Sequence, residues 1–275
     1  MSGALPAELS TPEARLEVAR EAERIAREAG DGLLEQLGRL REGDVRSKSA
    51  RRDLVTVADL AAERTIVERL RRRFPGHQIE AEEETRDAPD AGRPRWFVDP
   101  LDGTVNFVHQ LPAFAVSLGL YWGDEPLAGV VHAPRLAETF VAATGAGAWC
   151  AGTRLAVSET RELADALLAT GFPYRRNELD NDNLANFDRL FGQVRGMRRM
   201  GSAAIDLAFV AAGRLDAYWE LHLDPHDLAA GACLVREAGG LVTDTEGGQD
   251  WLRGGRIVAG PAELHAALLG QVDGR

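Results

Sequence analysis

The segment Asp99-Pro-Leu-Asp-Gly-Thr104 brings two carboxylates, a glycine and a threonine hydroxyl together in one short stretch of the chain. Carboxylate oxygens are the ligands that hard cations such as Mg²⁺ prefer in proteins. Free backbone amides at a turn or at the start of a helix bind phosphate oxygens. The segment can therefore hold a metal ion and the phosphate group that the ion would polarise. The alternative interpretation is structural: Asp102 begins an Asx turn and Gly103 completes it.

The residues before this segment have the composition of a buried strand. Trp96, Phe97 and Val98 are bulky or β-branched, as expected on a covered pleated surface. Pro100 cannot donate to a sheet ladder, so we expect the strand to end there. Gly103 permits a tight turn and a close approach of the backbone to a ligand. The pattern thus predicts two acids at the carboxyl end of a strand.

Several glutamates lie where they could join these two acids. Residues 78–81 alternate like a short strand, and Glu82, Glu83 and Glu84 follow it directly. The sequence leaves open which of the three would join the cluster. The alternative is a solvated acidic run, which is the usual role of such a sequence.

Three further aspartates lie near the predicted starts of helices. Thr56 or Asp59 can cap the helix that follows, and capping is the role we expect for Asp59. A cap explains Asp53 less well, because it lies upstream of that helix. Asp227 precedes another helix, where the helix dipole favours an acid.

Residues of the second half also lie at the ends of predicted elements. Gly201 and Ser202 open an apolar helix, and Ser202 is a good N-cap whose neighbouring open amides could face a ligand. Glu220 ends a predicted strand over residues 217–220. Packing or surface roles are expected for the isolated histidines, because hard oxygen ligands dominate the neighbourhood: His109, His132 and His226.

The composition bounds the class of protein. The chain has 275 residues, 45% of them hydrophobic, enough for a large core in one broad domain or two fused halves. A net charge of −11 argues against binding nucleic acid, which requires basic patches. Cys150 and Cys233 have no metal-binding spacing, and a reducing compartment explains them simply. We find no secretory signal and no apolar run that could span a bilayer, so we predict a cytoplasmic protein without a membrane partner.

The spacing of the apolar residues predicts a chain of the α+β or α/β class. We expect its two halves to form one catalytic unit. A capping-box pattern at residues 10–13 begins a long amphipathic helix, with Gly30 as a candidate break. Short alternating segments between residues 114 and 150 predict an antiparallel sheet in the N-terminal half, residues 1–151. Strand-helix units predict a smaller C-terminal half, residues 152–275, which completes the site.

The segment Trp96–Leu120, WFVDPLDGTVNFVHQLPAFAVSLGL, resembles the signature of the inositol monophosphatase family. Further motifs agree in order along nearly the whole chain: Asp53–Thr56, the acidic run at Glu82, Gly201–Ala204, Gly213–Glu220 and Asp227–Gly231. The resemblance implies a phosphomonoesterase that depends on two or three Mg²⁺ ions and is sensitive to Li⁺. It also implies a layered αβαβα sandwich of the sugar-phosphatase type, usually assembled as a homodimer.

The resemblance also assigns roles to individual residues. The metal ligands would be Glu82, Asp99, Asp102, Asp227 and the main-chain carbonyl of Leu101. Thr104, helped by Glu82, would position the attacking water, and Asp53 would support that threonine. The amides of Gly103 and Thr104 would hold the phosphate beside Asp102 and Asp227. The alcohol side of the substrate would be lined by Gly201, Ser202, Ala203 and Glu220.

The expected activity is hydrolysis of inositol 1-phosphate or a similar small polyol phosphate. Alternatives on the same fold are fructose-1,6-bisphosphatase, histidinol phosphatase and a phosphatase of 3′-phosphoadenosine nucleotides. A non-catalytic regulatory protein is the alternative from another class, against which the intact acids and Thr104 argue. Two departures from the family pattern are Ala81, where a glycine is frequent, and His226, where a tryptophan is common.

Overall fold

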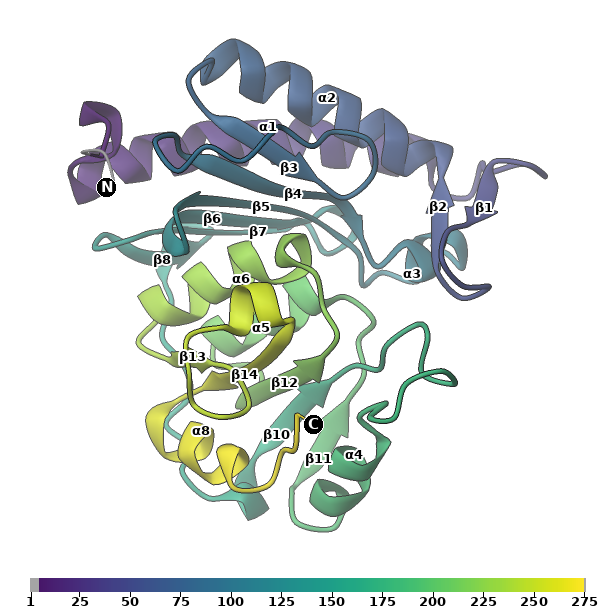
Figure 1. Cartoon of the computed structure of the whole chain (residues 1–275), viewed down its shortest axis with the longest axis vertical. Helices are drawn as coiled ribbons and strands as arrows, with labels where there is room; N and C mark the ends of the chain where they lie inside the picture. Colours follow the sequence, from purple (N-terminus) through teal and green to yellow (C-terminus); the bar gives the residue numbers. More distant parts are fainter. Residues whose placement is uncertain (1–4, 275) are drawn as a thin grey trace.

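Helices α1 (Pro12–Gln36) and α2 (Val57–Arg73) form an outer layer in the computed structural model, which describes residues 5–274 (Figure 1). Thr11 caps α1 by accepting a hydrogen bond of 3.2 Å from the Ala14 amide, as the sequence pattern predicts. The candidate break at Gly30 is wrong, because α1 continues through it. A Cβ at Gly30 would lie 2.5 Å from His132 Cδ2, so the glycine serves close packing against the sheet.

Beneath these helices, the larger sheet is a meander of seven strands within residues 5–274, in the order β3-β4-β5-β6-β7-β8-β9. β3 and β4 pair in parallel, whereas the later neighbours pair antiparallel as expected. The bounds are β3 (Gln78–Ala81), β4 (Arg95–Asp102), β5 (Ala115–Trp122), β6 (Glu125–Ala133), β7 (Glu138–Ala143), β8 (Gly147–Cys150) and β9 (Thr153–Arg154). The predicted division at residues 151 and 152 stays a prediction, and this sheet extends slightly past it.

Strand β4 continues through Pro100, where the sequence predicted that it would end. The β3 ladder stops at the pair Ala81–Val98, so Pro100 needs no hydrogen-bonding partner on that side. The register of β4 against β5 shifts between Asp99 and Asp102. This irregular strand end therefore carries both acids of the central motif.

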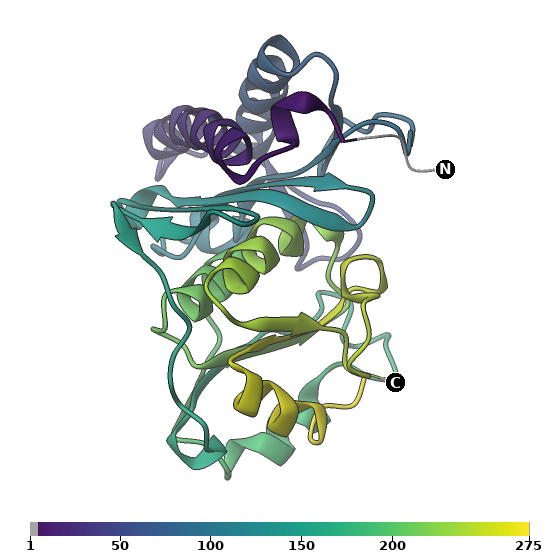
Figure 2. The same cartoon turned by 90° about the vertical axis from the view of Figure 1, so that its left-hand side faces the viewer.

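Helices α5 (Ala203–Ala211) and α6 (Pro225–Glu237) lie between the two sheets (Figures 1 and 2). Nearly every residue of α5 is buried, as expected for a helix that is apolar all round and covered on both sides. Because α5 and α6 touch both sheets, their first turns lie at the junction of the two halves. The acids near those turns are thereby brought close to the end of β4.

In the described residues the smaller sheet has five strands, in the order β11-β10-β12-β14-β13. β10 pairs in parallel with β11 and β12, and β14 pairs antiparallel with both neighbours. Its strands are β10 (Leu167–Thr170), β11 (Gly196–Arg198), β12 (Ala217–Leu221), β13 (Leu241–Thr243) and β14 (Arg256–Gly260). Helices α4 (Leu184–Phe191) and α8 (Ala262–Leu269) pack on its far face and complete the predicted αβαβα sandwich.

The remaining elements are short. β1 (Val45–Ser47) and β2 (Leu54–Thr56) form a hairpin, and α3 (Thr104–Val108) follows β4 directly. The others are α7 (Trp251–Gly254) and 3₁₀ turns at Ala7–Leu9, Pro134–Leu136 and Leu163–Asp165. Among the described residues, we find no helix with the length and apolar character needed to cross a membrane.

Candidate active site

Three predicted metal ligands converge where the two halves meet. Asp99 and Asp102 end β4, Asp227 lies in the first turn of α6, and one carboxylate oxygen from each lies within 4.8 Å of the others. Asp99 is 1% and Asp102 is 8% exposed. These donors are all carboxylate oxygens, the set that suits a hard divalent cation. The cluster can therefore hold a metal ion.

Backbone amides fix two of these carboxylates from neighbouring positions. The Leu101 amide donates to Asp99 Oδ1 at 2.9 Å, which closes the local turn after the regular ladder. The Asp224 amide donates to Asp227 Oδ2 at 2.7 Å, so Asp227 caps the start of its own helix. Asp99 and Asp227 thus have the structural roles that the sequence suggested, and each also offers one carboxylate oxygen to the cluster.

The third carboxylate, Asp102, is held by the other half of the chain. Its Oδ2 accepts hydrogen bonds from the Ser202 hydroxyl at 2.6 Å and from the Ala204 amide at 2.7 Å. Both donors belong to the start of α5, whose dipole favours a negative charge at this end. The first turn of α5 therefore orients an acid that β4 supplies.

Glu82, the fourth predicted ligand, is held at the edge of the cluster by Lys48. Lys48 Nζ lies 2.7 Å from Glu82 Oε1 and 2.5 Å from Glu83 Oε1. Glu82 lines the adjacent cavity, whereas Glu83 and Glu84 donate their backbone amides to Glu63. Of the three glutamates that the sequence left open, Glu82 is thus the one that faces the site.

Burial and mutual repulsion raise the pKa values of the three aspartates, which favours their protonated forms in the absence of a cation. Burial, followed by the charges of Glu82, Asp102 and Asp227, raises the pKa of Asp99 well above its usual range. Burial likewise raises the pKa of Asp102 to about 6 and that of Asp227 well above its usual value. Burial also acts on Glu82, but the charges of His226 and Lys48 outweigh it and lower its pKa. A bound cation would relieve the repulsion among these acids.

Thr104 is supported by Asp59 and not by Asp53, which corrects the role that the family resemblance implied. Thr104 Oγ1 lies 2.9 Å from Asp59 Oδ1 and 3.1 Å from the Leu101 carbonyl oxygen. The other oxygen of Asp59 accepts the amide and the hydroxyl of Thr56 at the start of α2. Asp59 therefore has the capping role that the sequence predicts and a second role toward Thr104. Burial raises its pKa to about 6.

Asp53 lies in the same cavity wall but has different partners. Its Oδ2 accepts the Ser49 amide at 3.1 Å and the Ser49 hydroxyl at 2.6 Å, which closes the loop of the β1–β2 hairpin. This contact holds Asp53 within its own loop, and among the described residues the partners of the Thr104 hydroxyl are Asp59 and Leu101. Asp53 still lines the cavity, so a part in the reaction remains a prediction.

Gly103 provides the turn between β4 and α3 that the sequence predicts. Its φ is +90°, in the left-handed region, and a Cβ would lie 2.8 Å from the Ala113 carbonyl oxygen. Asn106 Nδ2 ties this turn to the second half by donating to Ala113 O at 2.6 Å and to Met200 O at 2.9 Å. The amides of Gly103 and Thr104 therefore lie in a turn that is fixed from both halves.

A second group of acids occupies the far end of the cavity. Glu220 is the penultimate residue of β12, is buried, and accepts a hydrogen bond from the Tyr218 hydroxyl. Burial raises the pKa of Glu220 to about 7. Asp206, from α5, is 2% exposed, and its Oδ1 has no hydrogen-bond partner among the described residues. A Cβ at Gly171 would lie 2.1 Å from the Glu220 carboxylate, so this glycine makes room for the acid.

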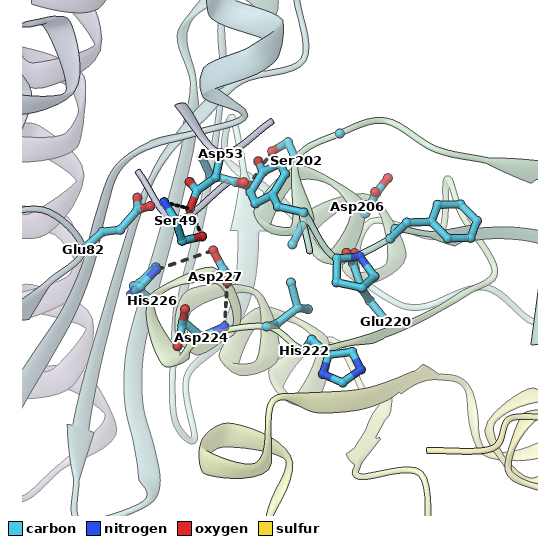
Figure 3. A pocket seen from close by; sticks show the side chains of 18 of the residues that line it. Ser49, Asp53, Glu82, Ser202, Asp206, Glu220, His222, Asp224, His226 and Asp227 are labelled. Carbon is cyan, nitrogen blue, oxygen red and sulfur yellow. Dashed lines mark hydrogen bonds and ion pairs between the residues drawn. The ribbon is translucent and has the colours of Figure 1, made fainter. Parts of the chain in front are cut away.

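The cavity between the two groups of acids has a volume of about 400 Å³. Figure 3 shows Glu82, His226 and Asp227 on one side and Asp206 and Glu220 on the other. The predicted alcohol-side residues line it as well: Gly201, Ser202, Ala203 and Glu220. The arrangement offers a metal-binding end and a hydrogen-bonding end, separated by a space of small-molecule size.

Sequence reasoning missed several residues of this site. No role at the site was predicted for Lys48, Asp206 or Arg199, which all line the cavity. His226 was expected to have a surface or packing role, but its buried ring lines the cavity 3.8 Å from Asp227. Of these residues, only Lys48 could have been singled out from the sequence. It is the one lysine of the chain, whose other strongly basic residues are all arginines.

Comparison with known proteins identifies the class to which this fold and this site belong. The sequence model of the inositol monophosphatase family matches residues 15–274, and the chain belongs to that family. This membership supports a phosphatase activity, and the family is one that uses metal ions.

Relatives carry two kinds of name. Nus factor SuhB of Pseudomonas aeruginosa is 47% identical over 250 residues, which cover 90% of this chain and 92% of that protein. Inositol-1-monophosphatase of Mesorhizobium japonicum is 40% identical over 244 residues, covering 89% and 91%. Among solved structures, the extragenic suppressor protein suhB of Bartonella henselae aligns with a TM-score of 0.87 at 38% identity, covering 93% and 98% of the two chains. The inositol monophosphatase of Anabaena gives 0.84 at 40% identity, covering 93% and 94%.

Proposed function

We propose that this protein is an Mg²⁺-dependent phosphatase of small polyol phosphates, with inositol 1-phosphate as the leading substrate. The observation that carries the proposal is the convergence of Asp99, Asp102 and Asp227 from two halves of the chain, beside a cavity of about 400 Å³. An all-oxygen donor set and a cavity of this size together suit a cation and a small phosphate ester.

The acids would hold two or three Mg²⁺ ions, with Glu82 and the Leu101 carbonyl completing the ligands. When bound, the ions would neutralise the phosphate dianion, make water a nucleophile near neutral pH and stabilise the leaving alkoxide. Lys48 already shields Glu82 electrostatically, so the cluster carries one compensating charge of its own. Without such compensation, a phosphate would be repelled by the aspartates.

The chain's own groups would position the reactants. Thr104, held by Asp59, would orient the attacking water, and Glu82 would receive its proton. The amides of Gly103 and Thr104 would bind phosphate oxygens and so fix the ester for in-line attack. Asp53, in the cavity wall, would hold the loop between β1 and β2 in place through its hydrogen bonds with Ser49.

The far end would recognise the leaving alcohol. Glu220, already bonded to Tyr218, has a free lone pair that can accept a hydrogen bond from a substrate hydroxyl. Gly201, Ser202 and Ala203 would line the ring beside it. A polyol fits this end better than an apolar alcohol, because buried acids left without hydrogen-bond donors are costly.

Phosphate release with Mg²⁺ on a panel of esters tests the proposal. The panel should contain inositol 1-phosphate, fructose 1,6-bisphosphate, histidinol phosphate and 3′-phosphoadenosine 5′-phosphate. We expect the highest kcat/KM for inositol 1-phosphate among the monophosphates. High activity on another ester with negligible activity on inositol 1-phosphate would overturn this ranking, and release from none of them would overturn the proposal.

The relatives named Nus factor SuhB favour one second candidate, a regulatory role that does not need catalysis. Asp102→Asn distinguishes the two, because it removes charge from the cluster and keeps the size of the side chain. If the biological activity of the protein survives this change, catalysis is not its main role. A homodimer, a cytoplasmic location and inhibition by Li⁺ also remain predictions, which light scattering, cell fractionation and a Li⁺ titration of phosphate release would test.

A further inference from the structure

Three asparagines around the first turn of α4 form one hydrogen-bonded cluster in the smaller half: Asn181, Asn183 and Asn186. The Asn186 side-chain amide donates to Asn183 Oδ1 at 3.1 Å, and the Asn183 backbone amide donates to Asn181 Oδ1 at 3.0 Å. Asn183 is 0% and Asn186 is 1% exposed. Buried amides of this kind stabilise a structure only where their polar atoms have partners. We call this cluster the asparagine network.

Asn183 joins the ends of two strands at the far end of the catalytic cavity. Its Nδ2 donates to the Thr170 hydroxyl at 2.9 Å and to the Gly171 carbonyl oxygen at 2.7 Å, where β10 ends. Its Oδ1 accepts a hydrogen bond of 2.9 Å from Trp219 Nε1, in β12. Trp219 directly precedes Glu220, and Gly171 is the residue that makes room for the Glu220 carboxylate. Asn183 therefore holds the two residues that lie against this acid.

The backbone at Asn183 restricts which residue can take this place. Its φ is +73°, in the left-handed region. Asparagine adopts this conformation more readily than most other residues with a side chain. Glycine adopts it as well but has no amide to offer. The position thus needs both the conformation and two side-chain donors.

The segment 271–274, which follows α8, is bound to the network through its backbone. Asn186 Nδ2 donates to the Asp273 carbonyl oxygen at 2.8 Å, and Asn186 Oδ1 accepts the Asp273 amide at 2.9 Å. Asn181 Nδ2 donates to the same carbonyl oxygen at 2.9 Å. In Figure 1 the yellow segment after α8 runs toward α4. Both backbone groups of Asp273 are therefore held by the residues that surround Asn183.

The network also reaches the rim of the cavity through His222. This residue follows β12, lines the cavity and has a φ of +63°. Its Nε2 lies 2.8 Å from the Asn181 carbonyl oxygen, and it carries the proton in this bond because a carbonyl can only accept. Figure 3 shows His222 and Glu220 on the same side of the cavity. The asparagine network thus holds the chain on both sides of Glu220, at Trp219 and at His222.

We propose that Asn183 is a positioning residue for Glu220, and that the segment 271–274, bound through Asn186, keeps Asn183 in place. Asn183 and the segment are not among the described residues that line the cavity, so they act through the place of the Glu220 carboxylate. Hydrogen bonds weaken steeply when their geometry is displaced, so a small shift of this carboxylate weakens its bond to the leaving alcohol. This role rests on the proposed function, because Glu220 recognises the alcohol only in that reaction.

Steady-state kinetics of two variants test the positioning role. Asn183→Asp keeps the size of the side chain but removes the donors to Thr170 and Gly171, and Asn186→Ala removes the bonds to Asp273. We expect KM for inositol 1-phosphate to rise about tenfold in Asn183→Asp and about threefold in Asn186→Ala, with a smaller change in kcat. KM for 4-nitrophenyl phosphate, whose alcohol has no further hydroxyl, should change less than about twofold.

The control is Ile66→Ala, a buried residue of α2 in the outer layer. It should lower stability and leave the ratio of the two KM values unchanged, because it creates a cavity away from the network. An unchanged ratio in both asparagine variants, or an equal change in the control, would overturn the inference. If Asn183→Asp does not fold, the ratio in Asn186→Ala decides.

Hydrogen–deuterium exchange without substrate tests the network apart from catalysis. Asn186→Ala should speed exchange several-fold in the segment 271–274 and also in residues 217–224, which Asn186 contacts only through Asn183 and Asn181. Faster exchange confined to the segment and α4 would overturn the inference. If exchange rises in both regions but neither ester is hydrolysed, the proposed function fails, whereas the coupling of the segment to β12 stands.

Discussion

The Ser202 hydroxyl donates a 2.6 Å hydrogen bond to Asp102 Oδ2, across the junction between the two halves of the molecule. The same hydroxyl accepts the Ile205 amide at 3.3 Å and so caps helix α5. One side chain therefore begins a helix and orients a predicted metal ligand. The structural role and the functional role that the sequence offered for Ser202 are compatible, because the two bonds use different lone pairs and protons.

Ser202→Ala should lower both stability and metal affinity. Loss of a helix cap costs about 1 kcal/mol in the free energy of unfolding, and loss of a partner behind a metal ligand weakens affinity about ten- to hundredfold. The control is Thr11→Ala, which removes the cap of α1 far from the site. Thermal unfolding and Mg²⁺ titration of both variants provide the check. An equal Mg²⁺ affinity in the two would show that Ser202 has a capping role only.

The bond between Asp59 and Thr104 predicts energetic coupling in catalysis. In a double-mutant cycle, we compare the activation free energies calculated from kcat. The effects of Asp59→Ala and Thr104→Val should depart from additivity by more than about 0.5 kcal/mol, because each substitution removes the same hydrogen bond. The matched cycle pairs Asp53→Ala with Thr104→Val and should be additive, since Asp53 bonds to Ser49. Coupling in the Asp53 cycle and additivity in the Asp59 cycle would reverse our correction of the predicted partner.

Glu220 should make stability depend on pH. Its folded pKa of about 7 lies above the unfolded value of about 4.3, so its contribution is fully present below pH 4.3 and is lost as the pH rises toward 7. Glu220→Gln removes this loss and can still accept from Tyr218. Between pH 5 and pH 8 in EDTA, we expect the wild type to lose about 2 kcal/mol relative to the variant. A constant difference in the free energy of unfolding across that range would contradict the raised pKa.

Gly171→Ala should damage the alcohol-binding end selectively. The new Cβ would lie 2.1 Å from the Glu220 carboxylate, which must then shift. We expect KM for inositol 1-phosphate to rise about tenfold, with a much smaller change for 4-nitrophenyl phosphate, whose alcohol has no further hydroxyl. Gly192→Ala is the control, because its φ is −82° and a Cβ there meets nothing within 4 Å. Equal losses on both esters would point to general misfolding.

Local patterns in the sequence predicted the elements well. The capping-box pattern at residues 10–13 predicted the long helix α1, which begins at Pro12 with Thr11 as its cap. Helix α6 begins at Pro225, earlier than predicted, because proline is favourable at the first helical position and Asp224 takes the cap. Asp227 thus lies inside the helix, in the turn that points it toward β4.

Contacts between distant segments could not be predicted in the same way. Nothing in the spacing distinguishes Asp53 from Asp59 as the partner of Thr104, because that choice depends on how α2 packs against α3. The same holds for the unpartnered oxygen of Asp206, which depends on how α5 packs against the smaller sheet. The role of Asp99–Thr104 could be predicted from the sequence because one turn brings its two carboxylates, its backbone amides and its threonine hydroxyl together.

The most direct test of the account is calorimetric titration of Mg²⁺ into the wild type and into Asp102→Asn and Asp227→Asn. The control is Asp165→Asn, an exposed acid that pairs with Arg195 away from the cluster. We predict Mg²⁺ binding to the wild type and the control, and a loss of affinity of more than about tenfold in each cluster variant. Equal Mg²⁺ affinity in all four proteins would contradict the claim that acids from the two halves form one metal site.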